Sequence, residues 1–174
     1  MTRMIALTAG PMLLAGCMTA STVDTVTDYQ AQASLNGPDG AAHGRALIGE
    51  GGGPKLAVRV EATGLPPGVH GVHIHAVGRC DPPDFQTAGP HWNPTGHQHG
   101  RDNPQGAHMG DLPNISIGAD GRGALDFAVP AATLAGLLDA DGAALVIHAG
   151  PDDYKSDPSG NSGGRIACGV IQRP

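Results

Sequence analysis

The sequence has few aromatic and few basic residues. Only 3% of its 174 residues are Phe, Trp or Tyr, so a core must be built from smaller aliphatic side chains. The same scarcity excludes a stacking surface for single-stranded nucleic acid. Ten Lys and Arg against sixteen Asp and Glu give a net charge of −6. This charge excludes the basic surface of a general nucleic-acid-binding protein, and we expect no nucleic-acid partner.

No apolar run is long enough to span a bilayer as a helix. Residues 1–16 (MTRMIALTAGPMLLAG) have one cation, then a short apolar stretch and small residues, which is typical of a secretory signal. The stretch ends at Cys17 and resembles a bacterial lipoprotein signal, which predicts cleavage before Cys17 and its lipidation. The alternative is a plain signal peptide with an incidental cysteine.

The segment after the signal is rich in Thr, Ser, Ala and Gln. We therefore expect a flexible spacer over 17–33 and a folded domain over 34–174. The predicted location is the periplasm or cell envelope, with a lipid anchor holding the protein to a membrane. Met rather than Asp follows Cys17, which favours the outer membrane.

Cysteine is scarce, with three in the chain. If Cys17 carries lipid, Cys80 and Cys168 remain as an even pair in an oxidising compartment, which predicts a disulfide between them. Two buried free thiols are the alternative.

Apolar residues recur with a period of two along most of the chain, which predicts β-strands. Gly, Pro and Asp turns separate the segments, among 28 glycines and 15 prolines. We predict an all-β fold, a Greek-key antiparallel β-sandwich or barrel of about eight strands. The expected strands lie at about 28–35, 41–49, 55–61, 72–75, 114–118, 122–129, 143–148 and 166–172. Residues 130–138 could form one or two helical turns.

Two stretches lack strand periodicity, 78–112 and 150–165. Long ordered loops in a small β domain are usually functional. The first stretch contains four histidines and the second is rich in charged residues. We therefore expect the chemistry of the protein to lie in these two loops.

Seven of the nine histidines lie between His70 and His108. His73 and His75 are two apart on a predicted strand, so their rings project to the same side. Another predicted strand ends in His148. Imidazoles alone suit copper or zinc, whereas imidazoles with one carboxylate suit zinc. The pattern predicts two nearby metal sites, one on the strands and one in the first long loop, where the candidate ligands are His91, His99, His108 and Asp111.

Three histidines have no such spacing. We interpret His43 and His97 as surface or hydrogen-bonded residues. His70, immediately before the strand pair, is interpreted as a residue that anchors a loop or supports a ligand.

Four separate segments resemble the copper/zinc superoxide dismutases of exported bacterial type. They are residues 70–75 (HGVHIH), 89–94 (GPHWNP), 108–112 (HMGDL) and 165–171 (RIACGVI). The resemblance runs from about residue 34 to the end, in the order of the family. It implies an enzyme that dismutes superoxide to dioxygen and hydrogen peroxide and protects the cell envelope, and it is compatible with a homodimer.

The resemblance also implies roles for individual residues. His91 would bridge copper and zinc and supply a proton, Arg165 would attract superoxide beside the copper, and Asp152 would link a copper ligand to a zinc ligand. Cys80 and Cys168 match the disulfide of the family. The implied copper ligands are His73, His75, His91 and His148, and the implied zinc ligands are His91, His99, His108 and Asp111. Trp92 departs from the usual Phe and should still pack. The charge pattern that steers the substrate in this family is not obvious in the sequence.

Two other classes of protein are compatible with parts of this pattern. One is a lipoprotein that buffers copper or zinc on the same fold without catalysis. It is distinguished by Arg165, which mere metal storage does not need. The other is an interaction sandwich with incidental histidines, which leaves the ligand spacing unexplained.

Overall fold

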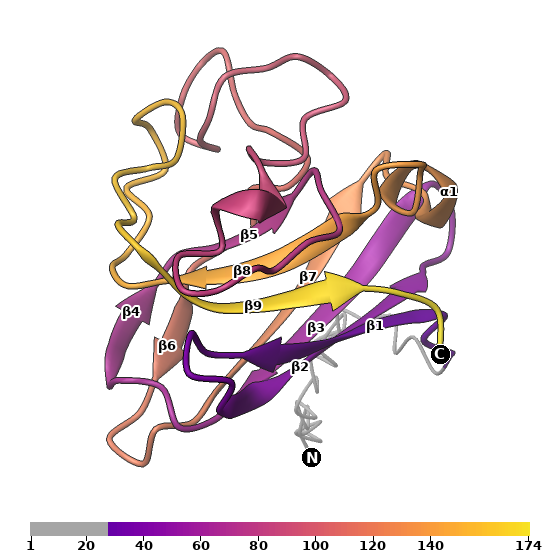
Figure 1. Cartoon of the computed structure of the whole chain (residues 1–174). Coiled ribbons are helices and arrows are strands. Elements are labelled where there is room, and N and C mark those ends of the chain that lie inside the picture. The colour runs from indigo at the N-terminus through magenta and orange to yellow at the C-terminus, as the bar shows by residue number, and fades with distance from the viewer. Residues whose placement is uncertain (1–27) are drawn as a thin grey trace, which may run out of the picture.

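The computed structural model describes residues 28–174 (Figure 1). The predicted signal over 1–16, Cys17 and most of the predicted spacer lie outside the described residues. Within the described range, no helix combines the length and apolar character needed to cross a membrane.

Nine strands account for most of the regular structure of the described residues, and they form two antiparallel sheets. The larger sheet has the order β5-β8-β9-β1-β2-β3-β7, and the smaller one pairs β4 with β6. The strands are β1 (Ala31–Asn36), β2 (Ala42–Glu50), β3 (Lys55–Ala62), β4 (Gly68–His70), β5 (Val72–His75), β6 (Ile115–Ile117), β7 (Gly123–Pro130), β8 (Ala143–His148) and β9 (Arg165–Ile171).

The sheet order requires long crossovers. β7 and β8 follow each other along the chain, yet β7 lies beside β3 at one edge of the large sheet and β8 lies beside β5 near the other. The large sheet is strongly curled (Figure 1). Such crossovers between antiparallel strands characterise Greek-key folds, and the predicted all-β class is confirmed.

The core consists almost entirely of aliphatic side chains, as the scarcity of aromatics requires. β1 and β3 alternate buried and more exposed positions, so one face of each strand packs inward. All residues of β5 and β8 are buried instead. A second small cluster, formed by Phe85, Ala88, Ala144, Val146 and Cys168, explains the burial of β8. Part of the first long loop therefore covers the outer face of β8.

The predicted strand positions agree with the structure to within a few residues. The exception is β4, which was missed because it is three residues long and begins at the glycine of a Pro-Pro-Gly turn signal. β1 begins at Ala31, before the expected domain start at Ser34. The segment 130–138 contains one short helix, α1 (Leu134–Leu137), whose N-cap Thr133 accepts a hydrogen bond from the Gly136 N–H. The 3₁₀-helix η1 (Gln86–Ala88) lies in the first long loop.

Cys80 and Cys168 form a disulfide, with their Cα atoms 5.7 Å apart. The bond joins the beginning of the first long loop to β9, so the predicted pairing is confirmed. Both long loops lie over the same end of the barrel, above β5 and β8 (Figure 1).

Candidate metal centre

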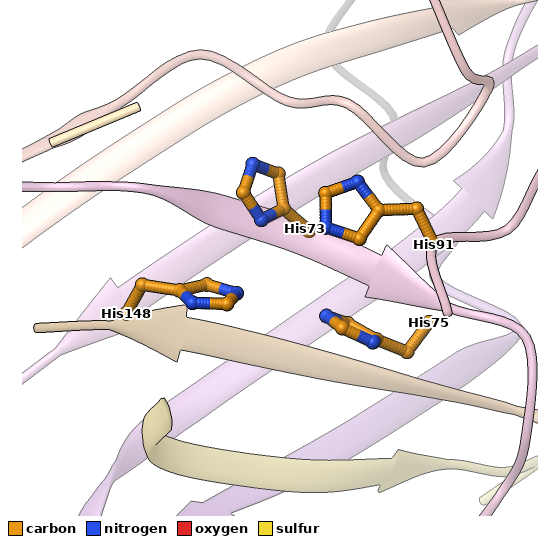
Figure 2. A group of neighbouring side chains, drawn as sticks. All are labelled: His73, His75, His91 and His148. Atoms are coloured by element: carbon orange, nitrogen blue, oxygen red, sulfur yellow. The ribbon is translucent and has the colours of Figure 1, made fainter. Parts of the chain in front are cut away.

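Four imidazoles converge at the end of β5 and β8. His73 and His75 come from β5, His148 ends β8, and His91 lies in the first long loop; their rings surround one point (Figure 2). One nitrogen of each ring lies within 4.8 Å of the nitrogens offered by the other three. All four side chains are buried, from 0% exposure for His73 to 6% for His91.

Backbone hydrogen bonds place the loop ligands. The segment around His91 lies along β5, with the Trp92 N–H donating to Ile74 O at 2.8 Å. The end of the loop returns to the same residue, because the Ile74 N–H donates to Gly110 O at 2.9 Å. Isolated bridges consequently put His91 opposite His75 and Asp111 opposite His73. Two short β-like contacts thus bring residues of the loop to the strand histidines.

Several buried ring nitrogens in this centre have no hydrogen-bond partner. They are Nδ1 of His73 and Nε2 of His75, His91 and His148. Nδ1 of His99 also makes no well-aligned hydrogen bond, although it lies 3.0 Å from Oδ1 of Asp111. The other nitrogen of His75 lies 2.8 Å from Gly89 O, and that of His148 lies 3.1 Å from Gly163 O. A buried polar atom without a partner is costly. Metal ions satisfy such atoms, so the residues present fit a bound cation.

A second group of donor atoms surrounds one carboxylate oxygen, Oδ1 of Asp111. Nδ1 of His91, His99 and His108 lies 2.8, 3.0 and 3.1 Å from this oxygen, respectively. Donors placed tetrahedrally about zinc lie about 3.3 Å apart, close to these separations. Oδ2 of Asp111 accepts hydrogen bonds from the Gly100 and His108 N–H groups. Oδ1 instead faces the three ring nitrogens, where a bound ion would replace these direct contacts.

His73 also lies close to this second group. Its donor atom falls within 4.8 Å of those of His91, His99 and Asp111. However, Nε2 of His73 is bonded to Asp152 at 2.8 Å, and its Nδ1 belongs to the strand group. His108 is better placed, since its Nδ1 lies 3.4 Å from that of His91 and 3.1 Å from Asp111. We therefore count His108 in the second group.

Asp152 connects the two groups. Its Oδ2 lies 2.8 Å from Nε2 of His73, and its Oδ1 lies 3.0 Å from Nε2 of His99. Asn114 holds the backbone of Asp152 on both sides, with its amide nitrogen bonded to Asp152 O and its amide oxygen to the Asp152 N–H, both at 2.9 Å. The carboxylate therefore orients one ring of each group.

The pKa values of the strand histidines favour neutral, ligand-ready rings. Burial lowers the pKa of His73 to about 3, of His75 to about 2 and of His148 to about 4. Burial also lowers the pKa of His91. Burial disfavours charge on His99 as well, but Asp111 and Asp152 outweigh this effect and raise its pKa to about 9.

The pKa of each carboxylate is lowered. For Asp111 and Asp152, hydrogen bonds from the neighbouring imidazoles overcome the effect of burial. His99 and these carboxylates therefore form a charged cluster in the metal-free protein, and a cation that binds there displaces a proton from His99.

We expect the metal-free protein to lose stability as the pH falls from about 6.5 towards 4. In this range the unfolded chain protonates His73, His75 and His148, whereas the folded protein keeps them neutral. Each such group costs about 1.4 kcal/mol per pH unit below 6.5. His99 gives no compensating gain, because it is already protonated in the folded protein throughout this range. Urea unfolding should show a lower midpoint at pH 5 than at pH 7; an unchanged midpoint would contradict the prediction.

A β-bulge positions Arg165. The register of β8 and β9 shifts between Ile147 and His148, so that Ile147 faces Ala167 but His148 faces Arg165. Bulges often redirect side chains next to active sites. The Arg165 guanidinium donates to Phe85 O at 2.7 Å and to Gly89 O at 2.9 Å. Its charge is thereby held beside the strand group of histidines.

An open cavity of about 790 Å³ leads to this centre and is lined by His75, His91, His148 and Arg165. Among the described residues that line it, Arg165 is the only Arg or Lys, whereas Asp139, Asp141 and Asp157 contribute negative charge. An anion entering the cavity therefore depends on Arg165 and on any bound cations for attraction.

The histidines outside the two groups have backbone partners, as expected for supporting residues. Both ring nitrogens of buried His70 face carbonyl oxygens, those of His148 at 2.8 Å and Pro66 at 2.9 Å. Nδ1 of His43 lies 3.1 Å from Thr63 O, and that of exposed His97 lies 3.2 Å from Ala107 O. Trp92 packs into the core with 7% of its surface exposed.

Sequence reasoning missed the residues that support Asp152. Asn114 lies far from Asp152 along the chain, and no spacing pattern links the two. Gly160 was also missed: a Cβ there would lie 1.8 Å from Oδ1 of Asp152 and 2.7 Å from Nε2 of His99. Its φ of +63° is left-handed, so glycine is needed for both conformation and space.

Gly160→Ala should displace Asp152 and weaken binding of the second ion by about 10- to 100-fold, a typical cost of losing a carboxylate that supports a metal ligand. Competition with a chromophoric zinc chelator measures the affinity. Gly96→Ala is the matched control, because Gly96 has a similar φ of +69° and no atom within 4 Å of an added Cβ. Equal zinc affinity in the two variants would refute the steric role of Gly160.

Together, the curled Greek-key fold and the paired donor groups define an all-β protein with a two-ion centre. The family model described as "Copper/zinc superoxide dismutase (SODC)" matches residues 25–171. Superoxide dismutase (Cu-Zn) 2 of Aquifex aeolicus is 43% identical over 166 residues, which cover 92% of this chain and 96% of that protein.

Solved structures of two similar proteins share the fold of this chain. A SOD-like protein from Bacillus subtilis has a TM-score of 0.78 at 40% identity, covering 82% of this chain and 99% of that one. The Cu/Zn superoxide dismutase from Brucella abortus has a TM-score of 0.67 at 31% identity, covering 82% of this chain and 100% of that one.

The chain belongs to the copper/zinc superoxide dismutase family. It is an oxidoreductase that acts on superoxide and uses copper and zinc. The disulfide and the bacterial relatives indicate a location outside the cytoplasm.

Proposed function

We propose that the protein dismutes superoxide at a copper ion linked to zinc through the ring of His91. The copper ligands in this proposal are His73, His75, His91 and His148, and the zinc ligands are His91, His99, His108 and Asp111. The observation that carries the assignment is the partnerless Nε2 of His91 in the strand group, together with its Nδ1, 2.8 Å from Asp111. One ring thus offers a donor atom to each group.

The overall reaction converts two superoxide anions and two protons to dioxygen and hydrogen peroxide. When bound, copper supplies the one-electron redox change and zinc a fixed positive charge. The protein's part is to hold and release a proton at Nε2 of His91. Nδ1 stays directed at the second group, so the ring keeps its orientation while the proton moves.

The other proposed site residues orient the metal-binding rings or attract the substrate. Asp152 holds the rings of His73 and His99 through their Nε2 atoms. Arg165 attracts the anionic substrate into a cavity whose other charged lining residues are acidic. Its two hydrogen bonds to backbone carbonyls fix the guanidinium beside His148.

The test is to measure metal content and activity on the same sample. Mass spectrometry should find both copper and zinc in the purified protein, and pulse radiolysis should show rapid loss of superoxide. Chelation should abolish the activity, and adding both metals should restore it. Protein that binds both ions without accelerating superoxide decay would instead be a metal-buffering protein, the alternative function.

The proposal also includes a location and an anchor. The predicted division into a signal over 1–16, a lipidated Cys17 with a spacer over 17–33, and a catalytic domain over 34–174 would place the enzyme in the periplasm on the outer membrane. There it would protect the envelope. Fractionation of cells expressing the full chain, with Cys17→Ser as control, tests the anchor: the variant should leave the membrane fraction. The same distribution for both chains would exclude lipidation at Cys17.

We also propose a homodimer, and only the resemblance to the family supports it. Val69, with 46% exposed, is the large hydrophobic side chain that stands out on the described surface. Sedimentation velocity distinguishes one chain from two, and a single-chain species at micromolar concentration would exclude the dimer.

A further inference from the structure

Six histidines make up the two donor groups. In five of them, each ring nitrogen either faces a proposed metal position or has an oxygen partner. His73 and His99 direct Nε2 at Asp152, while His75 and His148 direct Nδ1 at backbone carbonyls. Both nitrogens of His91 face donor groups. A histidine that binds a metal through one nitrogen usually gives the N–H of the other to an oxygen, which fixes the ring and strengthens the ligand. Nε2 of His108 remains to be explained.

Asp157 lies next to this nitrogen. Its Oδ1 is 4.0 Å from Nε2 of His108, too long for a direct hydrogen bond but close enough for the carboxylate charge to act on the ring at that nitrogen. Its side chain is 50% exposed and lines the cavity together with His108. Solvent therefore screens the attraction, which makes its effect moderate.

The same oxygen also holds the backbone of another zinc ligand. Oδ1 of Asp157 accepts a hydrogen bond from the His99 N–H at 2.6 Å. Asp157 belongs to the second long loop, whereas His99 and His108 belong to the first. One carboxylate from one loop thus contacts two ligands of the second ion in the other loop, and contacts neither His75 nor His148.

We propose that Asp157 is a positioning residue for the zinc site, which fixes the backbone of His99 and places negative charge beside Nε2 of His108. This inference rests on the proposed zinc ligands. A role as a simple loop connector would need only the hydrogen bond to His99. A positioning role through charge needs the carboxylate itself, and the two roles are separable by substitution.

The experiment compares the wild type with Asp157→Asn, Asp157→Ala and a matched control, Asp102→Asn. Asparagine keeps an oxygen for the His99 N–H but removes the charge, and alanine removes both. Asp102 is exposed in the first loop and does not line the cavity, so its variant makes the same change of charge elsewhere. Zinc affinity is measured by chelator competition, and the visible spectrum of Co²⁺ in the zinc site reports ligand geometry.

We expect Asp157→Ala to weaken zinc binding by about 10- to 100-fold. Asp157→Asn should lose a measurable part of the affinity and alter the Co²⁺ spectrum, while Asp102→Asn should match the wild type. Zinc affinity and a spectrum unchanged in Asp157→Asn would overturn the positioning role, whatever the alanine variant does. A wild type that binds no zinc would instead refute the proposed zinc site. Circular dichroism of the metal-free proteins confirms that each variant is folded.

Discussion

His91→Ala should lower turnover by about 10²- to 10⁴-fold, the usual contribution of a positioned proton donor. The variant removes the one ring that offers Nε2 to the strand group and Nδ1 to the group around Asp111. Three imidazoles remain on the copper side, so some copper should still bind. Its rate is measured by pulse radiolysis after loading with both metals, and the values are corrected for copper content.

The same variant tests the bridge independently of activity. With copper placed in both sites, the wild type should show coupled spins in its electron paramagnetic resonance spectrum, and His91→Ala should show two isolated copper signals. His97→Ala is the matched control, since His97 lines the same cavity but its ring bonds only to the backbone carbonyl of Ala107. Persistent coupling in His91→Ala would rule out a shared ring.

Arg165→Glu should slow turnover by about 10- to 10³-fold at low ionic strength, the range over which electrostatic attraction changes association rates. The substrate is an anion, the chain carries a net charge of −6, and the cavity is also lined by Asp139, Asp141 and Asp157. Reversal of the guanidinium charge removes the main protein attraction in this cavity. Both metals should remain bound, because the hydrogen bonds of Arg165 go to backbone carbonyl oxygens and not to a ligand ring.

Added salt and a charge-matched control variant distinguish a loss of substrate attraction from a distortion of the site. The difference between Arg165→Glu and wild type should shrink as salt is added, because ions screen the charge. Arg122→Glu makes the same charge change on the exposed turn between β6 and β7 and should have little effect. Arg165→Gln leaves the charge neutral and should fall between the wild type and Arg165→Glu. Unchanged turnover of Arg165→Glu at low ionic strength would refute the guiding role.

Much of the fold could be predicted from local patterns. The alternation of the larger apolar residues Leu56, Val58 and Val60 with smaller or charged neighbours identified β3, because the side chains of a strand point to alternate faces. The pairing of Cys80 with Cys168 followed from the number of cysteines and the compartment. β4 could not be found in this way, since its three residues form a strand only by pairing with β6, far away along the chain.

For the candidate site as well, the sequence predicted one part and the tertiary structure decided the rest. Sequence alone determined which donor types are available, because imidazole and carboxylate chemistry belongs to the residue itself, and it placed His73 and His75 on one side of a strand. Only the tertiary structure decided which nitrogen of each ring faces a neighbour. It also decided that Asp111 returns to β5 through the backbone of Ile74 and Gly110, and that a bulge sets Arg165 against His148. These features depend on hydrogen bonds and close approaches between distant segments, as at Gly160 and Asp157, and no local periodicity encodes them.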